Sequence, residues 1–327
     1  MVLKVENILE RFPLRVSITD NCNLACFFCS NEVLGDSRNQ VSIAPDDFRY
    51  LVGTLRNYGL EHLSLSGGDP TAHPKALEIV QIANQSGVPN RFYHTNGILL
   101  AKDGLADALG EFTKVGVSLH NTDPQRYAQI TGGRASQYEK AIDGLRALAE
   151  KGLAKKVEVK HVTVKGMNDD LESLRGTLDL CAQYGFKFKF LNFEAIHSNQ
   201  VPLVQDVRVI KQRVEALGAI SVPERGSTFR GQTDYLPVSW YSYKGTNGVV
   251  IDVGCGRPEV CRSCHDSNEI YVTPRLGIKA CKMSDHEIPL KEAIERKDSE
   301  SILDAVLESR RFLESQPGLG KNHWGQR

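Results

Sequence analysis

The chain has 327 residues, no formal net charge and 41% hydrophobic residues, which is the composition of an ordinary globular protein of one or two domains. The balanced charge argues against a surface that coats nucleic acid or binds an anionic membrane. No stretch is apolar for long enough to cross a bilayer, and the N-terminus lacks the apolar core of a signal peptide. We therefore expect no nucleic acid and no membrane among the partners. We also expect a cytoplasmic location, where the eight cysteines bind metal rather than form disulfides.

Short strand-like segments alternate with amphipathic helix-like segments from residue 14 to about residue 195. The expected strands are residues 14–19, 62–66, 90–95, 115–119, 156–164 and 187–193. The expected helices are residues 45–59, 74–87, 100–112, 136–152, 170–185 and 204–218, with a further helix at 300–314. Repeated βα units of this kind predict an α/β fold built on a parallel sheet.

Three cysteines with Cys-x3-Cys-x2-Cys spacing follow the first expected strand, at Cys22, Cys26 and Cys29. Three thiolates on one loop can hold three irons of a four-iron cluster, which leaves the fourth iron open to another ligand. The alternative is a zinc site or three buried thiols. Zinc sites usually combine paired Cys-x2-Cys elements into four ligands, so the spacing favours the cluster.

Polar motifs follow the next three expected strands. They are Gly67-Gly68-Asp69-Pro70, Thr95-Asn96-Gly97 and His120-Asn121. Functional residues of parallel βα units lie on the loops after the strands, so these motifs should gather at one edge with the cysteine loop. Glycines allow a backbone to approach a ligand closely. Gly-Gly-Asp-Pro is also good turn chemistry, and that alternative remains open.

In the sixth expected strand Phe186, Phe188 and Phe190 alternate with Lys187 and Lys189. A period of two sends the two residue types to opposite faces of the sheet. We expect the phenylalanines to pack beneath helices and the lysines to point inward, toward an anionic ligand or an internal carboxylate. The alternative is a frayed edge strand with solvated lysines.

A second group of cysteines lies at Cys255, Cys261, Cys264 and Cys281. A Cys-x2-Cys pair with a distant third cysteine indicates a metal site. A four-cysteine zinc ribbon looks similar, and ligand type alone rarely fixes the metal. The first motif favours iron, so we expect a second, auxiliary [4Fe-4S] cluster. The expected domains are a barrel at residues 1–220 and a small cysteine-rich segment with a C-terminal helix at residues 221–327.

The first cysteine loop, Cys22-Asn-Leu-Ala-Cys26-Phe-Phe-Cys29, resembles that of the radical S-adenosylmethionine (SAM) superfamily. The resemblance implies a partial (β/α)6 TIM-like barrel. It also implies that the amino and carboxylate groups of SAM chelate the open iron of a [4Fe-4S] cluster. An electron, from a donor such as flavodoxin or ferredoxin, then cleaves SAM. The resulting 5′-deoxyadenosyl radical abstracts a hydrogen atom from the substrate.

The same resemblance implies which residues hold SAM. Gly67-Gly68-Asp69 resembles the Gly-Gly-Glu motif that binds the SAM amino group, while Thr95 and Ser118 would contact its carboxylate and ribose. The full set implied for cofactor binding is Gly67, Gly68, Asp69, Thr95, Ser118 and Lys160.

Residues 117–124 and 164–169 resemble the MoaA-like branch, the GTP 3′,8-cyclases, which carry a C-terminal auxiliary iron–sulfur segment of the twitch or SPASM type. Departures occur where that branch carries basic or amide residues: His73 replaces an arginine, and Glu158 and Lys160 stand in place of Lys-x-Asn. A triphosphate needs several cationic donors, of which Arg15 remains. We therefore expect a different substrate.

The sequence thus predicts a radical SAM enzyme with an auxiliary cluster that acts on a small molecule. The expected substrate is a nucleoside, nucleotide or sugar-like compound of natural-product biosynthesis, bound by Arg15, Lys187 and Lys189. No catalytic acid or base is assigned, because radical generation needs none. Three alternatives remain open: GTP 3′,8-cyclisation, peptide modification, and a non-enzymatic zinc-ribbon protein.

Overall fold

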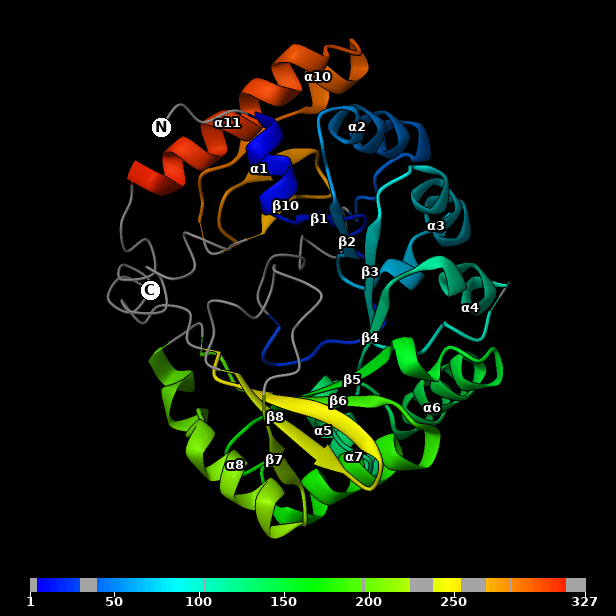
Figure 1. The fold of residues 1–327 in the computed structure, drawn as a ribbon, viewed down its shortest axis with the longest axis vertical. Coiled ribbons are helices and arrows are strands. Elements are labelled where there is room, and N and C mark those ends of the chain that lie inside the picture. Colours follow the sequence, from blue (N-terminus) through cyan, green and yellow to red (C-terminus); the bar gives the residue numbers. More distant parts are fainter. Residues whose placement is uncertain are drawn as a thin grey trace.

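The computed structural model describes residues 5–29, 40–102, 104–195, 198–223, 238–253, 269–282 and 284–315. These residues form one sheet of twelve strands, in the order β12-β11-β10-β1-β2-β3-β4-β5-β6-β9-β8-β7. Viewed along the barrel axis, the sheet curves around a centre and the helices lie outside it (Figure 1). The fold is the α/β fold with a partial TIM-like barrel that the sequence predicts.

The first six strands are parallel and follow one another in chain order. Each begins and ends within two residues of its expected position. They are β1 (Leu14–Ser17), β2 (His62–Ser66), β3 (Asn90–Thr95), β4 (Lys114–Ser118), β5 (Val157–Thr163) and β6 (Lys187–Asn192). The loops that follow these strands therefore lie at one end of the barrel.

The C-terminal part of the chain adds strands to both edges of this sheet. One edge continues through β10 (Ile270–Val272), parallel to β1, into β11 (Gly277–Lys279) and β12 (Ile288–Pro289). The other continues through β9 (Thr246–Ile251), parallel to β6, into β8 (Val238–Tyr243) and β7 (Ile220–Val222). Sequence patterning places no strands beyond residue 193. The expected domain boundary at residue 220 stays a prediction.

Helices connect the parallel strands and cover the outer face of the sheet (Figure 1). Asp123 and Asp170 accept hydrogen bonds from the first free N–H groups of their helices and so fix where these helices begin. Helices α1, α5 and α10 are not among the expected helices. The helices are α1 (Val5–Arg11), α2 (Pro45–Asn57), α3 (Ala76–Gln85), α4 (Leu105–Ala108), α5 (Pro124–Thr131), α6 (Ala135–Glu150), α7 (Leu171–Tyr184), α8 (Val207–Ala216), α10 (Lys291–Glu295) and α11 (Ser299–Ser315). Short 3₁₀ turns are η1 (Pro70–Ala72), η2 (Leu109–Glu111), η3 (Ala154–Lys156) and η4 (Ser198–Leu203).

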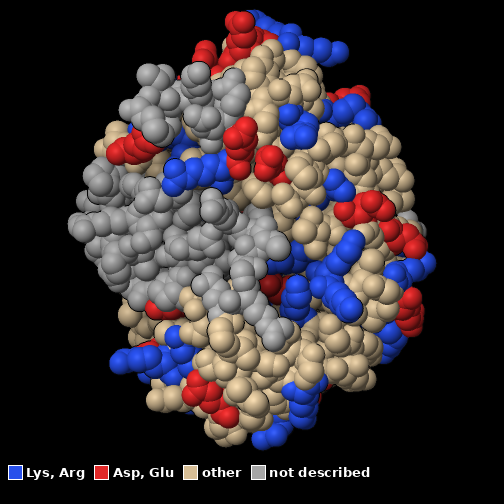
Figure 2. All heavy atoms as spheres, in the orientation of Figure 1, with Lys and Arg blue, Asp and Glu red and all other residues tan. Residues whose placement is uncertain are grey.

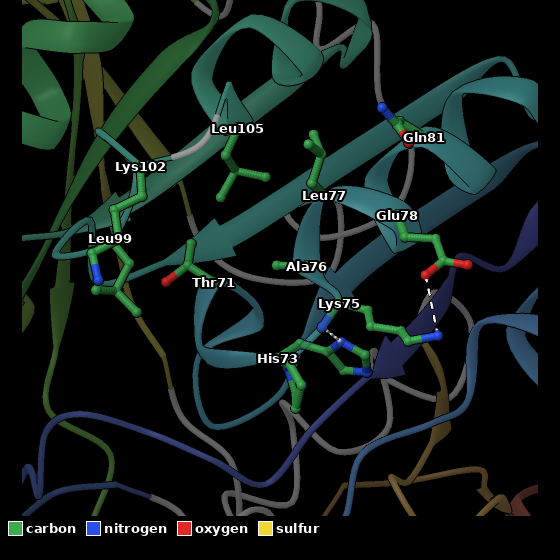
Figure 3. Close-up of a pocket in the computed structure, with 11 residues that line it drawn as sticks. Thr71, His73, Lys75, Ala76, Leu77, Glu78, Gln81, Leu99, Lys102 and Leu105 are labelled. Carbon is green, nitrogen blue, oxygen red and sulfur yellow. Dashed lines mark hydrogen bonds and ion pairs between the residues drawn. The ribbon is translucent and has the colours of Figure 1, made fainter.

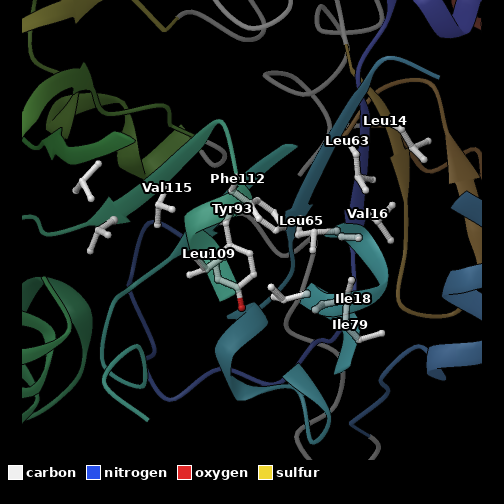
Figure 4. Packing of buried hydrophobic residues seen from close by; sticks show 14 of the residues in the cluster. Leu14, Val16, Ile18, Leu63, Leu65, Ile79, Tyr93, Leu109, Phe112 and Val115 are labelled. Atoms are coloured by element: carbon white, nitrogen blue, oxygen red, sulfur yellow. The ribbon is translucent and has the colours of Figure 1, made fainter. Parts of the chain in front are cut away.

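Alternation along the strands gives the barrel an apolar outside and a polar lumen. One set of alternate residues is buried in a single hydrophobic core beneath the helices, part of which Figure 4 shows. It includes Val16, Leu65, Tyr93, Val115, Val159 and Phe188. The intervening residues are polar or charged, among them Arg15, Ser64, His94, Glu158, Lys160 and Lys189. Because successive strand residues point to opposite faces, this second set faces the centre of the barrel.

The surface carries charges of both signs. Figure 2 shows acidic and basic side chains interspersed over the face seen along the barrel, with Lys and Arg side chains gathered near its centre. Within the part of the chain that the structure describes, no helix is both long and apolar enough to span a membrane.

We predict an acid-sensitive contribution from His161, which is buried beneath α7. Its ring contacts the Thr177 hydroxyl at 2.9 Å and the Asn168 carbonyl at 3.2 Å, and burial lowers its pKa from 6.5 to about 4. The unfolded chain therefore takes up a proton below pH 6.5 that the folded chain does not, so stability falls as the pH falls through this window. Between pH 7.5 and 5, urea denaturation of wild type should lose about 2 kcal/mol more than His161→Gln. An identical pH dependence in the two proteins would contradict this prediction.

Candidate functional site

The loops after β1 and β2 are joined by backbone hydrogen bonds. The N–H of Gly68 donates to the Thr19 carbonyl at 2.8 Å, and that of Asp69 donates to the Asn21 carbonyl at 2.7 Å. On the other side of the cysteine loop, the N–H of Ala25 donates to the Thr131 carbonyl at 2.9 Å. The loop that carries the three cysteines is thus held by the chain segments after β2 and β4.

Gly67 and Gly68 are required by this contact. A Cβ atom on Gly67 would lie 2.3 Å from the Thr19 carbonyl oxygen, and one on Gly68 would lie 2.2 Å from the Asn21 oxygen. Gly67 also has a φ of 145°, which favours glycine. The two glycines let the backbone of the cysteine loop approach closely, whatever else they contact.

Aromatic contacts hold the far end of the cysteine loop. The ring of Phe28 meets His120 edge-on at 4.9 Å and Phe193 at 6.4 Å between centroids. His120 follows β4 and Phe193 follows β6, so Phe28 connects the loop to both. Such edge-to-face pairs contribute about 0.5–1.5 kcal/mol beyond area burial.

The thiols of Cys22, Cys26 and Cys29 are half-buried and are not in disulfides. The pKa of Cys22 is raised to about 11 and that of Cys26 to about 12, mainly by burial, with a smaller contribution from the neighbouring thiols. Three thiolates in this position therefore repel one another unless a cationic group binds them. Within the described ranges, no three His, Cys, Asp or Glu side chains converge on one metal ion.

Asp69 is buried and fully occupied by donors of the protein. Its Oδ1 accepts from the Thr71 N–H at 2.9 Å and the Thr71 hydroxyl at 2.5 Å. Its Oδ2 accepts from the Asn96 N–H at 2.6 Å, and the Thr95 hydroxyl reaches both oxygens at 3.0 Å. Burial raises the pKa of Asp69, while the hydrogen bonds from Asn96 and Thr71 oppose that rise. The carboxylate therefore joins the loops after β2 and β3.

A buried hydrogen-bonded chain crosses three strands of the lumen. Lys160 Nζ on β5 donates to His94 Nδ1 on β3 at 2.6 Å, and His94 Nε2 donates to the Ser64 hydroxyl on β2 at 2.8 Å. Burial and the nearby ammonium of Lys189 hold the pKa of Lys160 well below its usual range. Burial, followed by the charge of Lys160, lowers the pKa of His94 in the same way.

Among the described residues, the lumen also contains ion pairs. The Glu158 carboxylate lies 3.5 Å from Lys114 and 3.5 Å from Lys189. Burial opposes the ionisation of Glu158, but these ammonium groups outweigh it and hold its pKa well below its usual range. Arg15 pairs with Glu269 at 2.6 Å. The lumen therefore contains more cationic than anionic side chains among the described residues.

Residues 16–181, half of the chain, match the family model of the radical SAM superfamily. The chain belongs to the radical SAM superfamily. Members of this family use SAM together with a [4Fe-4S] cluster, so the chain is an enzyme of the radical SAM type.

Curated relatives cover nearly the whole chain. The chain is 25% identical over 299 residues to a probable GTP 3′,8-cyclase of Pyrobaculum aerophilum, which covers 90% of this chain and 91% of that protein. It is 27% identical over 287 residues to the GTP 3′,8-cyclase of Lactiplantibacillus plantarum, with 86% and 82% covered. The resemblance to the MoaA-like branch is thereby confirmed.

A solved structure confirms the fold of this radical SAM chain. The structure of Streptococcus suis SuiB bound to S-adenosylmethionine superposes with a TM-score of 0.64 and 16% sequence identity. The alignment covers 97% of this chain and 71% of that one. The likeness supports the fold alone.

The residues expected from sequence fall into three groups. Gly67, Gly68, Asp69 and Thr95 adjoin the cysteine loop, and Ser118 is half-buried beside Lys160 in the β4–β5 register. Lys189 and Arg15 lie in the lumen, whereas Lys187 is exposed at the first residue of β6 and is not brought together with them. Cys255, Cys261 and Cys264 lie outside the described residues, and Cys281 is half-buried after β11.

Sequence reasoning missed Lys114, Ser64 and Glu269 as lumen residues. The signal for Lys114 is its place two residues before Gly116 and four before Ser118, which puts all three on one face of β4. Glu269 lies directly before a strand that sequence patterning did not predict.

A separate pocket of about 360 Å³ lies outside the barrel, between η1, α3 and the loop after β3 (Figure 3). Its wall includes Thr71, Leu99 and Lys102, together with Lys75 and Glu78, which pair at 3.4 Å. The side chains labelled in Figure 3 come from η1, α3 and the chain after β3, and not from the inward-facing residues of the strands. We therefore do not assign it to the reaction.

We predict that Gly68→Ala detaches the cysteine loop from the turn after β2. The added methyl has no space beside Asn21 and should cost about 1–3 kcal/mol of unfolding free energy. Iron content after anaerobic reconstitution should fall below half that of wild type. Gly53→Ala is the matched control, because no atom lies within 4 Å of its added Cβ in α2, and it should keep full iron content. Equal iron content in Gly68→Ala and wild type would contradict the role assigned to this contact.

Proposed function

We propose that the thiols of Cys22, Cys26 and Cys29 hold the SAM-binding [4Fe-4S] cluster, with SAM at the open iron beside the Gly67-Gly68 turn. The observation that carries the proposal is the attachment of this loop at the end of the lumen by Gly68, Asp69 and Ala25. When bound and reduced, the cluster would supply the one electron that cleaves SAM into methionine and a 5′-deoxyadenosyl radical. A donor such as flavodoxin or ferredoxin would provide that electron.

The residues of the chain position SAM and exclude water from it. Both oxygens of Asp69 accept from protein donors, so carbonyl groups of the glycine turn are better placed than this carboxylate to bind the SAM amino group. Thr95 is engaged in the same network, while Ser118 is a half-buried hydroxyl on β4. We infer that Asp69 and Thr95 act mainly by shaping the turn, and that Ser118 and Lys160 face the bound molecules.

The lumen favours a small anionic substrate. Lys160, Lys189, Lys114 and Arg15 all raise the local positive potential at His94, whereas Glu158 and Glu269 are the carboxylates paired with them among the described residues. Burying cations without equal anionic charge is costly, and a bound anion would offset that cost. A nucleotide or sugar phosphate carries such a group, and Lys160 is the cation best placed to bind it.

An auxiliary cluster on Cys255, Cys261, Cys264 and Cys281 remains part of the proposal. Cys281 is half-buried, and the adjacent Lys282 pairs with Glu194 at 3.0 Å, which connects this segment to the chain after β6. Four cysteines would complete the second cluster and favour an electron-transfer role over substrate binding.

GTP 3′,8-cyclisation is the second candidate function. The two relatives described above are named for this reaction, and the alignment with this chain covers 91% and 82% of their lengths. Incubation of the reduced enzyme with SAM and GTP, followed by analysis for a cyclised nucleotide, decides between GTP and another anion. Guanosine, nucleoside monophosphates and sugar phosphates complete the substrate panel.

We predict that Cys26→Ala abolishes reductive SAM cleavage. Two thiolates cannot hold the cluster in the geometry that leaves one iron open, so release of 5′-deoxyadenosine under dithionite should fall to background. Cys181→Ala is the matched control, because Cys181 is buried on α7 away from the cysteine loop, and it should retain most of the activity. Turnover by Cys26→Ala at the wild-type rate would contradict the proposal.

We predict that Lys160→Met weakens substrate binding without preventing SAM cleavage. Removing one charged hydrogen bond to an anion costs about 1.5–3 kcal/mol, so KM for the anionic substrate should rise by about tenfold or more. Lys187→Met, on an exposed lysine of the neighbouring strand, should leave KM unchanged. Steady-state kinetics on the substrate found in the panel measure both, and an equal KM in the two variants would contradict a role for Lys160.

A further inference from the structure

The side chain of Asn96 lies against the first cysteine of the loop. We propose that Asn96 is a positioning residue that donates an N–H···S hydrogen bond to Cys22 and thereby sets the reduction potential of the cluster. The inference rests on the proposed function, because it requires the cluster to be bound by Cys22.

The orientation of the Asn96 amide is fixed by its neighbours. Its Oδ1 accepts from the N–H of Ile98 at 3.1 Å, which leaves the NH₂ group to point toward the cysteine loop. One N–H donates to Asn23 Oδ1 at 2.6 Å, and Nδ2 lies 3.8 Å from Cys22 Sγ. The two hydrogens of the amide thus have two separate acceptors on the same loop.

The backbone of Asn96 is held as firmly as its side chain. Asp69 accepts the N–H of Asn96 at 2.6 Å and also accepts from the hydroxyl of Thr95. That hydroxyl in turn accepts from the N–H of Gly97 at 3.0 Å. Asn96 is 8% exposed, so no water competes freely for its amide. The arrangement of Asp69, Thr95 and Gly97 therefore presents a preorganised donor to the sulfur.

Electrostatics give the direction of the effect. The potential of an iron–sulfur cluster depends on hydrogen bonds to its sulfurs and on solvent exposure. Reduction adds negative charge to the cluster and its thiolates, and a fixed N–H dipole stabilises that charge. The donor in question is the Asn96 amide, whose Nδ2 lies 3.8 Å from Cys22 Sγ. Loss of the Asn96 amide should therefore disfavour the reduced state.

The three thiols are unequal in this respect. Among the described residues, no side chain donates a hydrogen bond to Cys26 Sγ. A change at Asn96 thus acts on one sulfur of the three.

The test is a redox titration of the reconstituted full-length protein, followed by electron paramagnetic resonance of the reduced cluster. In Asn96→Ala the reduction equilibrium should become about tenfold less favourable, which is a shift of about 59 mV to more negative potential for one electron. Asn96→Asp, which keeps the size and replaces the donor with an acceptor, should shift further in the same direction. The control is Asn121, which follows β4 and donates its buried side-chain amide to the Ser173 hydroxyl on α7. Asn121→Ala should leave the reduction potential unchanged.

The outcomes separate this inference from the proposed function. An unchanged potential in Asn96→Ala and Asn96→Asp, with wild-type iron content, would overturn the role of Asn96 and leave the cluster assignment intact. Loss of iron from both variants, with Asn121→Ala intact, would also overturn it, because Asn96 would then be needed for assembly. A wild-type protein that binds no four-iron cluster would instead overturn the proposed function.

Discussion

Two glycines lie closer to the backbone of the cysteine loop than any side chain would allow. The turn at Gly67 and Gly68 packs against the carbonyl groups of Thr19 and Asn21, and two backbone hydrogen bonds join the segments. The position of Cys22, one residue beyond Asn21, follows from this contact. The Cys22 thiol, and with it the contact from the Asn96 amide, is placed relative to this turn. A methyl group at either glycine would separate the loop from the sheet that supports it.

The second constraint is the charge of the lumen. The outward residues of the strands fill a hydrophobic core, so the inward residues must be satisfied by one another or by a ligand. Glu158 and Glu269 form ion pairs with some of the cationic side chains. Lys160 instead donates a hydrogen bond to the neutral ring of His94. A lysine in that environment loses its proton easily in the absence of an anion. A bound anion would stabilise the protonated form of Lys160, so this lysine favours the binding of an anionic molecule.

Period-two and period-3.6 patterns were sufficient to predict the six parallel strands and most of their helices, because these elements bury one face each. Phe186, Phe188 and Phe190 lie in the core as alternation predicts. Alternation alone does not distinguish Lys187 from Lys189, since it gives the face and not the depth along the barrel: Lys187 is exposed and Lys189 is buried. The strands β7 to β12 join the sheet through β10 and β9, which pair with β1 and β6, and these partners are distant in sequence.

The site was predictable as a set of loops but not as a network. The cysteine spacing and the Gly-Gly-Asp-Pro motif locate the loops after β1 and β2. They do not reveal that the Asp69 carboxylate accepts hydrogen bonds from Thr71, Thr95 and Asn96. These hydrogen bonds depend on the distance in space between the loops after β2 and β3. Asn96 belongs to a motif visible in the sequence, yet only the structure brings its amide to Cys22.

The most direct test of an iron left open by three thiolates is electron–nuclear double resonance of the reduced protein with SAM that carries ¹⁵N in its amino group. Our account predicts a hyperfine coupling between the cluster and that nitrogen, which disappears when Cys26 is replaced by alanine. A reduced cluster with no nitrogen coupling, or a purified protein that contains zinc and no acid-labile sulfide, would contradict it.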